Sequence, residues 1–218
     1  MSDIDLYEKS AETYEKLQLK RPDYVFARQA FLDLAVIHLK DKLPLTLTDF
    51  CCGIGNNTRL IADRFPVQKA TLIDINKEFL DIAQKSGIRA LDVSIVHSNI
   101  LLVNLKSEYD LVISMFAYHH VPDEDKGKYI ENVKSALKVG GILLLGEIYS
   151  SDKETTLKYY EHLLDSIDKS VRTLELEKFL MQTASSDHFE YKVSRKFAHN
   201  QLIKAGFVLK DFFKVWPK

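Results

Sequence analysis

The chain has 218 residues, of which 46% are hydrophobic and 28% charged, as in an ordinary soluble protein. Its 30 basic and 31 acidic residues nearly cancel, which disfavours a nucleic-acid-binding or membrane-surface protein. From the acidic, polar start we expect no secretory signal, and no apolar run reaches membrane-spanning length. Cys51 and Cys52 are adjacent and therefore poorly placed for a disulfide, so we expect a reduced, cytoplasmic setting.

Helical patterns come first along the chain. Apolar residues recur in steps of three and four over 4–19, which predicts a helix, and a second pattern over 23–40 follows Pro22. Pro44 ends this preamble. We therefore expect residues 1–44 to form helices that precede the main fold.

Short apolar segments then alternate with helical patterns. Predicted strands cover 45–50, 70–75, 93–97, 110–116 and 141–148. The predicted helices between them cover 58–64, 76–86 and 123–138. This alternation predicts an α/β fold, a three-layer α/β/α sandwich around a mostly parallel sheet with helices on both faces.

The alternation breaks after the fifth predicted strand. Residues 152–183 have a helical pattern, 193–205 another, and 207–216 resemble a last strand. We expect a single domain over 1–218, in which 45–149 form the core and 150–192 a helical cap. Residues 193–218 would supply the final helix and strand.

Candidate ligand-binding residues follow three predicted strands. The turn DFCCGIGNNT contains Gly53 and Gly55, which permit a sharp bend and close approach of a ligand. Asp74 ends the second strand, where its carboxylate suits two ribose hydroxyls, and Asn99 follows the third, within reach of an adenine edge. Ligands of open α/β sheets bind at these strand ends. The plainer interpretation is a tight turn with solvent-exposed Asp74 and Asn99.

A dinucleotide-dependent oxidoreductase is a competing interpretation. Such enzymes also combine glycines with an acidic residue about 20 positions later. Thr58 stands where their third glycine would be, a preamble of some 45 residues precedes the first strand, and no second nucleotide-binding half is visible. These features favour another nucleotide-binding class.

The stretch 46–148 resembles the class I S-adenosylmethionine-dependent methyltransferases. Five segments resemble that family's motifs in order: TLTDFCCGIGNNT, TLIDIN, VHSNI, YDLVISMFAYHHVPD and LKVGGILLLGE. Two positions depart from the pattern, because the family usually has glycine at Cys51 and aspartate at Asn99. It also usually closes with a two-strand hairpin, whereas one strand is evident here after Gly206.

The resemblance implies S-adenosylmethionine as cofactor, with the preamble over residues 1–44 covering it. The residues implied in cofactor binding are Asp49, Cys51, Cys52, Gly53, Gly55, Asp74, Ile75, Asn99, Ile100, Met115, Tyr14 and Arg21. In related enzymes an N-terminal tyrosine and arginine hold the methionine portion, hence Tyr14 and Arg21. An ordinary packing stripe is the alternative for Tyr14, and a solvated turn for Arg21.

The chemistry expected is in-line methyl transfer to a small molecule. His119 and His120 are candidate bases, or they orient their loop by hydrogen bonds; two adjacent histidines without further ligands predict no metal site. Glu147, Tyr159 and Tyr160 are candidate substrate contacts, although Tyr160 packing inward is the alternative. We expect no nucleic-acid or membrane partner, and a monomer or homodimer. A cofactor-binding protein without turnover is the second alternative to an enzyme of this class.

Overall fold

The computed structural model describes residues 16–185 and 191–215. Two compact units emerge from the chain. The first contains the residues up to Ala30, His119–Pro122 and the chain from Ile148 onward, whereas the second contains Phe31–Tyr118 and Asp123–Glu147. The predicted Tyr14 lies outside the described residues.

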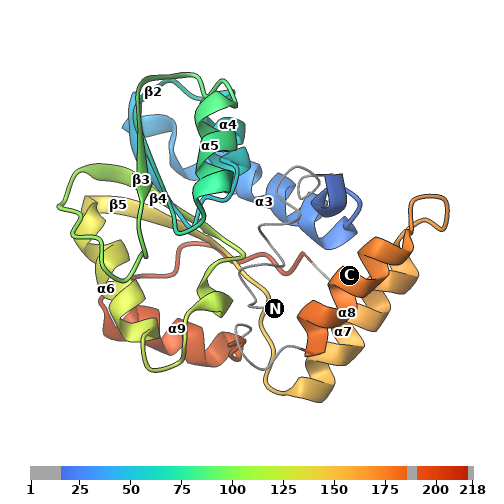
Figure 1. Cartoon of the computed structure of the whole chain (residues 1–218). Coiled ribbons are helices and arrows are strands. Elements are labelled where there is room, and N and C mark those ends of the chain that lie inside the picture. Colours follow the sequence, from blue (N-terminus) through green and yellow to red (C-terminus); the bar gives the residue numbers. More distant parts are fainter. Residues whose placement is uncertain (1–15, 186–190, 216–218) are drawn as a thin grey trace. The chain divides into compact units, whose positions relative to one another are not determined.

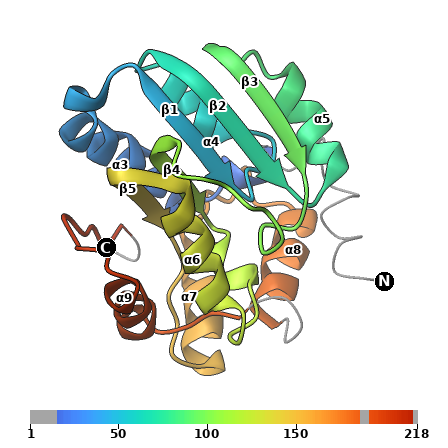
Figure 2. The same cartoon turned by 90° about the vertical axis from the view of Figure 1, so that its left-hand side faces the viewer.

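The second unit is built on a five-stranded sheet in the order β3-β2-β1-β4-β5, with every pairing parallel (Figure 2). This confirms the predicted α/β fold. The strands are β1 Leu45–Phe50, β2 Val67–Asp74, β3 Ala90–His97, β4 Tyr109–Met115 and β5 Leu137–Gly146. Central strands carry apolar residues on both faces, and Leu47, Leu72 and Ile113 are fully buried.

The helices of this unit cover both faces of the sheet. Right-handed crossovers run outward in opposite directions from β1 and from β4, which places α4 and α5 on one face and α6 on the other (Figure 1). These helices are α4 Asn56–Ala62, α5 Lys77–Lys85 and α6 Lys126–Ala136, and α3 Pro22–His38 ends in this unit after the first unit's Ala30. The strand order reverses between β1 and β4, and this reversal marks where a ligand binds.

The first unit is helical, with α7 Lys153–Ser166, α8 Leu174–Ser185 and α9 Arg195–Lys204. Helices α7 and α8 pack side by side (Figure 1). Their shared core contains Leu163, Leu180 and Phe179, together with Leu17 from the preamble. No helix among the described ranges is long and apolar enough to cross a bilayer.

The helical pattern predicted over 152–183 is wrong between Ser166 and Leu174, where the chain breaks and separates two helices. Ile167 adopts an extended conformation, and the Asp168 carboxylate accepts hydrogen bonds from the backbone and hydroxyl of Ser170. Thr173 then caps the next helix by accepting from the Leu176 amide. Local side-chain bonds of this kind compete with helix continuation, and the apolar periodicity does not register them.

The final strand predicted over 207–216 is also wrong for the residues described there. Residues 207–215 contain no strand, and Val208, Leu209 and Phe213 are exposed. The amides of Gly206 and Phe207 instead close α9, and the Arg195 guanidinium lies 4.5 Å from the centre of the Phe212 ring. An apolar segment becomes a strand only where a sheet edge pairs with it, which its composition does not determine.

Candidate cofactor site

The turn after β1 uses its two glycines for different purposes. Gly53 and Gly55 have positive φ angles of 53° and 78°. A side chain at Gly55 would lie 3.0 Å from Leu72 Cδ2 and 3.3 Å from Ala83 Cβ, so this glycine lets the turn approach β2 and α5 closely. A side chain at Gly53 would meet nothing within 4 Å. Open space therefore lies beside the turn at Gly53, which suits a bound ligand.

Asp74 ties this turn to the end of β2. One carboxylate oxygen accepts from the Gly53 amide and the other from the Asn76 amide, both at 2.8 Å. Burial raises the pKa of Asp74, although these backbone hydrogen bonds oppose the rise. Because each carboxylate oxygen can accept two hydrogen bonds, Asp74 retains acceptor capacity for two ribose hydroxyls.

The end of β3 lies beside Asp74. The Ser98 amide donates to the Asp74 carbonyl at 3.0 Å, and a ring nitrogen of His97 lies 2.9 Å from the Ile75 carbonyl oxygen. Asn99 follows, with its side-chain oxygen accepting from the Leu101 amide at 2.9 Å. One lone pair of this oxygen thus holds the turn, and the second remains for an adenine amino group. Ile75 is largely exposed at this edge.

Buried contacts also hold the segments behind these strand ends. The Asn132 side chain of α6 donates to the Ile100 carbonyl at 2.8 Å, which fixes the segment after Asn99. Met115 ends β4 and is buried, and a side chain at Gly146 would approach Met115 Cγ within 3.3 Å. The predicted residues Ile100 and Met115 therefore lie in tightly packed surroundings.

Asp49 links β1 to the start of α4, on either side of the glycine turn. It is buried in β1 and accepts from the Thr58 hydroxyl at 2.7 Å. Burial raises the pKa of Asp49 to about 7. The hydrogen bonds from Thr58 oppose this rise, and the negative charge of Asp74 adds to it. Thr58, whose position disfavoured a dinucleotide site, therefore anchors the start of α4 to β1.

We expect the folded chain to be more stable in mild acid than at alkaline pH because of Asp49. Its pKa is about 7 when folded, above its value near 4 in the unfolded chain, so folding favours the protonated carboxyl. This stability is complete below about pH 4 and is lost as the pH rises through about 7, by on the order of 2 kcal/mol between about pH 5.5 and about pH 7.5. Urea unfolding at both pH values measures it.

Asp49→Asn is the matched variant for this measurement. The amide oxygen can still accept from Thr58 but the side chain does not titrate, so the loss of stability with rising pH should shrink. The remaining slope has the sign set by Asp74, whose pKa is also raised. An unchanged slope in Asp49→Asn would contradict the assignment to Asp49.

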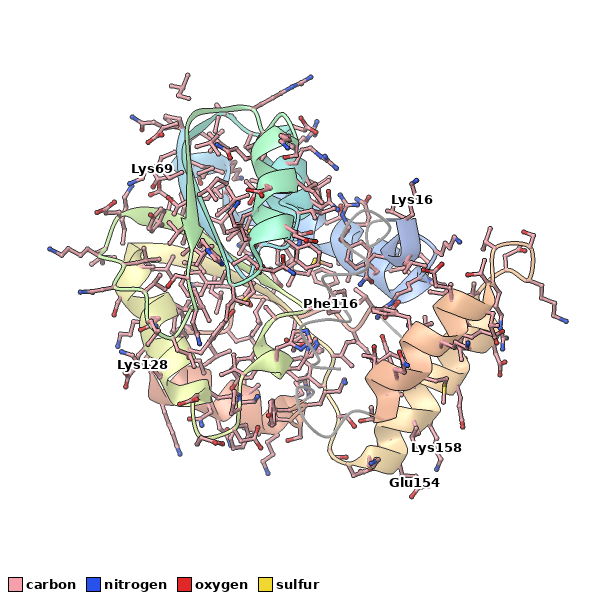
Figure 3. All side chains as sticks on the ribbon, viewed as in Figure 1. Lys16, Lys69, Phe116, Lys128, Glu154 and Lys158 are labelled. Atoms are coloured by element: carbon pink, nitrogen blue, oxygen red, sulfur yellow. The ribbon has the colours of Figure 1, made fainter. Side chains whose placement is uncertain are left out.

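Two residues with side chains adopt the left-handed backbone conformation at neighbouring strand ends. Cys51 after β1 has φ 55°, and Phe116 after β4 has φ 53°. Figure 3 shows Phe116 where the chain leaves β4, and its amide donates to the Gly146 carbonyl at 2.8 Å. Such conformations cost about 1–3 kcal/mol each and gather at ligand sites. These two flank the reversal of strand order.

Buried polar atoms of the turn fit a polar ligand. Within the described part of the chain, Asn56 Nδ2 and Asn57 Oδ1 are buried without a hydrogen-bond partner. Both residues follow Gly55 directly. A donor and an acceptor left unsatisfied within four residues of Gly53 fit the charged, polar amino-acid end of S-adenosylmethionine, and the Asp74 carboxylate fits its ribose.

The adjacent cysteines are neutral thiols. Both are free. Burial is the largest cause that raises the pKa of each thiol, and the negative charges of Asp74 and Asp49 raise it further. The charge of Glu147, the residue after β5, also acts on Cys51. Glu147 directly follows Gly146, which pairs with Met115 at the end of β4.

Arg21 is engaged within the first unit. Its guanidinium binds the Asp23 carboxylate through two nitrogens, at 3.2 and 2.7 Å, and the Gln18 side chain at 3.0 Å. The Tyr159 hydroxyl donates to the same Asp23 carboxylate. Burial alone would raise the pKa of Asp23, but Arg21 and Tyr159 outweigh it and lower that pKa. Arg21 is thus a buried structural ion pair rather than the solvated turn considered above.

The remaining predicted residues of the first unit are also largely packed. Tyr160 is buried in the core of α7 and α8, so it packs inward. His119 is buried, its ring lies 4.1 Å from that of His120, and its carbonyl accepts from the Tyr191 amide at 2.6 Å. Among the residues that the structure describes, no three His, Cys, Asp or Glu side chains group as metal ligands.

Several residues of the site were missed by sequence reasoning. Asn76 caps α5 by accepting from the Phe79 amide, and asparagine before a helical pattern is a recognisable cap signal. Asn56 and Asn57 belong to the turn DFCCGIGNNT and precede a predicted helix, so the sequence also marked them as candidate polar residues of the site. Nothing in the sequence marks Phe116 as left-handed, because aromatic residues rarely adopt that conformation.

Comparison with known proteins agrees with this geometry. Residues 47–141 match the family model described as a methyltransferase domain. The malonyl-(acyl-carrier protein) O-methyltransferase of Acetivibrio thermocellus is 28% identical over 62% of this chain and 44% of that protein. The tRNA N(3)-methylcytidine methyltransferase of Schizosaccharomyces pombe is 24% identical over 68% and 64%. The chain thus spans less than two thirds of either relative.

A solved structure shows the same fold. The cyclopropane synthase of Mycobacterium tuberculosis superimposes with a TM-score of 0.61 at 22% identity, covering 84% of this chain and 61% of that one. Residues 47–141 thus match a methyltransferase domain, and the fold around the glycine turn is that of the class I S-adenosylmethionine-dependent methyltransferases. The cofactor of this class is S-adenosylmethionine.

Proposed function

We propose that the chain transfers a methyl group from S-adenosylmethionine to a small-molecule acceptor by in-line displacement. The observation that carries this proposal is the Asp74 carboxylate, which holds the glycine turn at Gly53 beside open space and keeps acceptor capacity for a ribose. S-adenosylmethionine supplies a methyl group on a sulfonium, an excellent leaving group. The chain then needs chiefly to position the acceptor and exclude competing geometries.

Within this proposal the predicted residues take distinct roles. Asp74 and Ile75 bind the ribose, Asn99 and Ile100 the adenine, and the turn from Cys51 to Gly55 the amino-acid end. Asp49 holds the turn, and Met115 borders the site at the end of β4. His119 or His120 would serve as the base for a hydroxyl acceptor. Arg21 supports a cofactor role less well, because Asp23 already neutralises its guanidinium.

A small acceptor is favoured over RNA by charge. The chain has a net charge of −1, and polyanion binding rests on clustered basic residues. One curated relative is a tRNA methyltransferase, and an RNA acceptor is therefore the alternative to a small molecule. The two free thiols support a reduced cytoplasmic setting as part of the same proposal.

Calorimetric titration of the purified chain with S-adenosylmethionine, S-adenosylhomocysteine and NAD tests the cofactor assignment. We expect micromolar binding of both adenosyl sulfur compounds, because Asp74 and the glycine turn suit an adenosine ribose, and none of NAD, because Thr58 stands where a dinucleotide site has its third glycine. Binding of NAD alone would overturn the proposal in favour of an oxidoreductase.

Turnover separates an enzyme from a protein that only binds the cofactor. Screening small acceptors for S-adenosylhomocysteine release, with tRNA as a parallel sample, tests both points. Release with a small acceptor supports the proposal. Release with tRNA alone would replace the small-molecule acceptor, and cofactor binding without release across a broad screen would favour the binding protein.

A further inference from the structure

Tyr118 has a buried hydroxyl that nothing around it satisfies. The residue lies three positions after the end of β4, and its side chain is 1% exposed. No described residue forms a hydrogen bond with Tyr118 Oη. A buried polar group without a partner costs about 1–3 kcal/mol, so its retention calls for a partner supplied from elsewhere.

Lys126 holds Tyr118 in place. This lysine starts α6 and its side chain is fully buried. Its ammonium donates to the Tyr118 carbonyl at 3.2 Å, lies 4.8 Å from the centre of the Tyr118 ring, and pairs with Asp123 at 3.3 Å. Three contacts from one cation fix both the backbone and the ring, so the hydroxyl is presented in a set position.

Packed aromatic rings connect Tyr118 to the cofactor turn. The Phe50 ring, directly before Cys51, lies 5.7 Å from the Tyr129 ring, and the Tyr129 ring lies 5.7 Å from that of Tyr118. Tyr129 itself is satisfied, since its hydroxyl lies 2.7 Å from Ser114 Oγ. Tyr118 therefore belongs to the same rigid group of side chains as the end of β1.

The Lys126 ammonium is paired with Asp123, and the other charges that act on Tyr118 and the cofactor turn are carboxylates. Besides burial, Asp123 and Glu147 raise the pKa of Tyr118. Burial, Asp74, Asp49 and Glu147 raise that of Cys51. The sheet geometry brings these residues together, because Met115 at the end of β4 pairs with Gly146, and Glu147 and Tyr118 follow these two residues closely. A negative field of this kind, in surroundings with little water, attracts a cationic ligand and repels an anionic one.

We propose that the methyl acceptor is a small amine whose nitrogen binds between the Tyr118 hydroxyl and the Glu147 carboxylate, with Lys126 as the positioning residue of Tyr118. The inference rests on the proposed methyltransferase function and narrows its acceptor class. An amine N–H donates to Tyr118 Oη, and the carboxylate of Glu147 offsets the charge of the ammonium form. A carboxylate or phosphate acceptor would instead face Glu147 and Asp123.

The reaction balances with groups already present. The bound ammonium gives one proton to Glu147, which passes it to solvent, and the freed nitrogen lone pair forms the new N–C bond. The S–C bond of the cofactor breaks with its electron pair remaining on sulfur. The products are S-adenosylhomocysteine, an N-methylammonium and one proton.

Three matched probes test the acceptor class by calorimetry: benzylamine, benzyl alcohol and benzoate, each titrated with and without S-adenosylhomocysteine. We expect benzylamine to bind at least about tenfold more tightly than the other two, in keeping with a desolvated charged hydrogen bond. Equal binding of the three, preference for benzoate, or no binding of benzylamine would overturn the inference. Failure of S-adenosylhomocysteine itself to bind would instead count against the proposed function.

Tyr118→Phe and Glu147→Gln should each weaken benzylamine binding about tenfold while leaving S-adenosylhomocysteine affinity within about twofold. Tyr129→Phe is the matched control. It removes a hydroxyl that has a partner, so it should lower the thermal midpoint and leave benzylamine binding unchanged, whereas Tyr118→Phe should not lower the midpoint. Unchanged benzylamine affinity in Tyr118→Phe would overturn the inference.

Lys126→Met tests the positioning role. It should lower benzylamine affinity without changing the preference for benzylamine over benzoate, because Lys126 orients the hydroxyl and does not touch the amine. Lys126→Arg, which keeps the charge, should restore part of that affinity. Full affinity in Lys126→Met, in protein that binds S-adenosylhomocysteine normally, would contradict this role.

Discussion

Gly55→Ala is expected to lower the free energy of unfolding by about 2–5 kcal/mol. The left-handed backbone at Gly55 costs a residue with a side chain about 1–2 kcal/mol, and forcing a methyl group into a packed interior costs about 1–3 kcal/mol more. The new Cβ would lie 3.0 Å from Leu72 and 3.3 Å from Ala83, side chains held by β2 and α5. Urea unfolding of the wild type and the variant measures the loss.

Two other glycines provide controls for Gly55→Ala. Gly53 and Gly87 also have positive φ angles, of 53° and 72°, but a side chain at either meets nothing within 4 Å. Their alanine variants should therefore show the backbone cost alone, about 1 kcal/mol. Gly53→Ala should in addition weaken S-adenosylhomocysteine binding, while Gly87→Ala should not. Equal destabilisation at Gly55 and Gly87 would show that close packing at Gly55 is unimportant.

The sheet could be predicted from the sequence because its central strands β1, β2 and β4 are mostly buried. Strand β4 contains the apolar run Leu111–Ile113, and β1 begins directly after Pro44, so few alternatives to a strand remain. Strand starts were less accurate: β2 begins at Val67 and β3 at Ala90, where polar and exposed residues mask the pattern. Pairing with the neighbouring strand extends these elements, and such pairing is a tertiary effect.

Most of the candidate cofactor-binding residues could also be predicted from the sequence. Glycines at a strand end and an acidic residue at the next strand end have a direct physical purpose, and Asp74 does hold Gly53. The residues that support this geometry from neighbouring elements could not be predicted from the sequence. The bond from Thr58 to Asp49 and the burial of Lys126 against Tyr118 depend on which side chains the fold brings together.

In the helical first unit, the sequence predicted the presence of helices but not the break between them or the contacts of Arg21. Its apolar stripes predicted helices and placed Tyr160 among the inward-facing alternatives, but the break at Asp168 follows from local hydrogen bonding. Arg21 could be read as a ligand for a carboxylate or as a solvated turn. The structure pairs it with Asp23 and Gln18 instead, two neighbours whose role no periodicity indicates.

Asp74→Ala is expected to weaken S-adenosylhomocysteine binding by at least about 100-fold, on the order of 3 kcal/mol. The substitution removes the acceptor for two ribose hydroxyls, each hydrogen bond to a charged group contributing about 1.5–3 kcal/mol. It also leaves the amides of Gly53 and Asn76 without their carboxylate, so the glycine turn loses its link to β2. Calorimetric titration with S-adenosylhomocysteine measures the change, and urea unfolding shows whether the fold persists.

Asp74→Asn and Asp81→Asn separate the two causes. The asparagine at position 74 keeps one oxygen to accept a backbone amide but presents an NH₂ group to the other, so affinity should fall while more of the stability is retained than in Asp74→Ala. Asp81 lies exposed on α5, where it pairs with Lys77 at 2.9 Å in contact with solvent, and its variant should bind normally. Unchanged binding in Asp74→Ala would mean that the ribose lies elsewhere. Loss in Asp74→Ala and Asp74→Asn, with normal binding in Asp81→Asn, would place it at the junction of β2 and the glycine turn, because only there does one carboxylate serve both the backbone and the ligand.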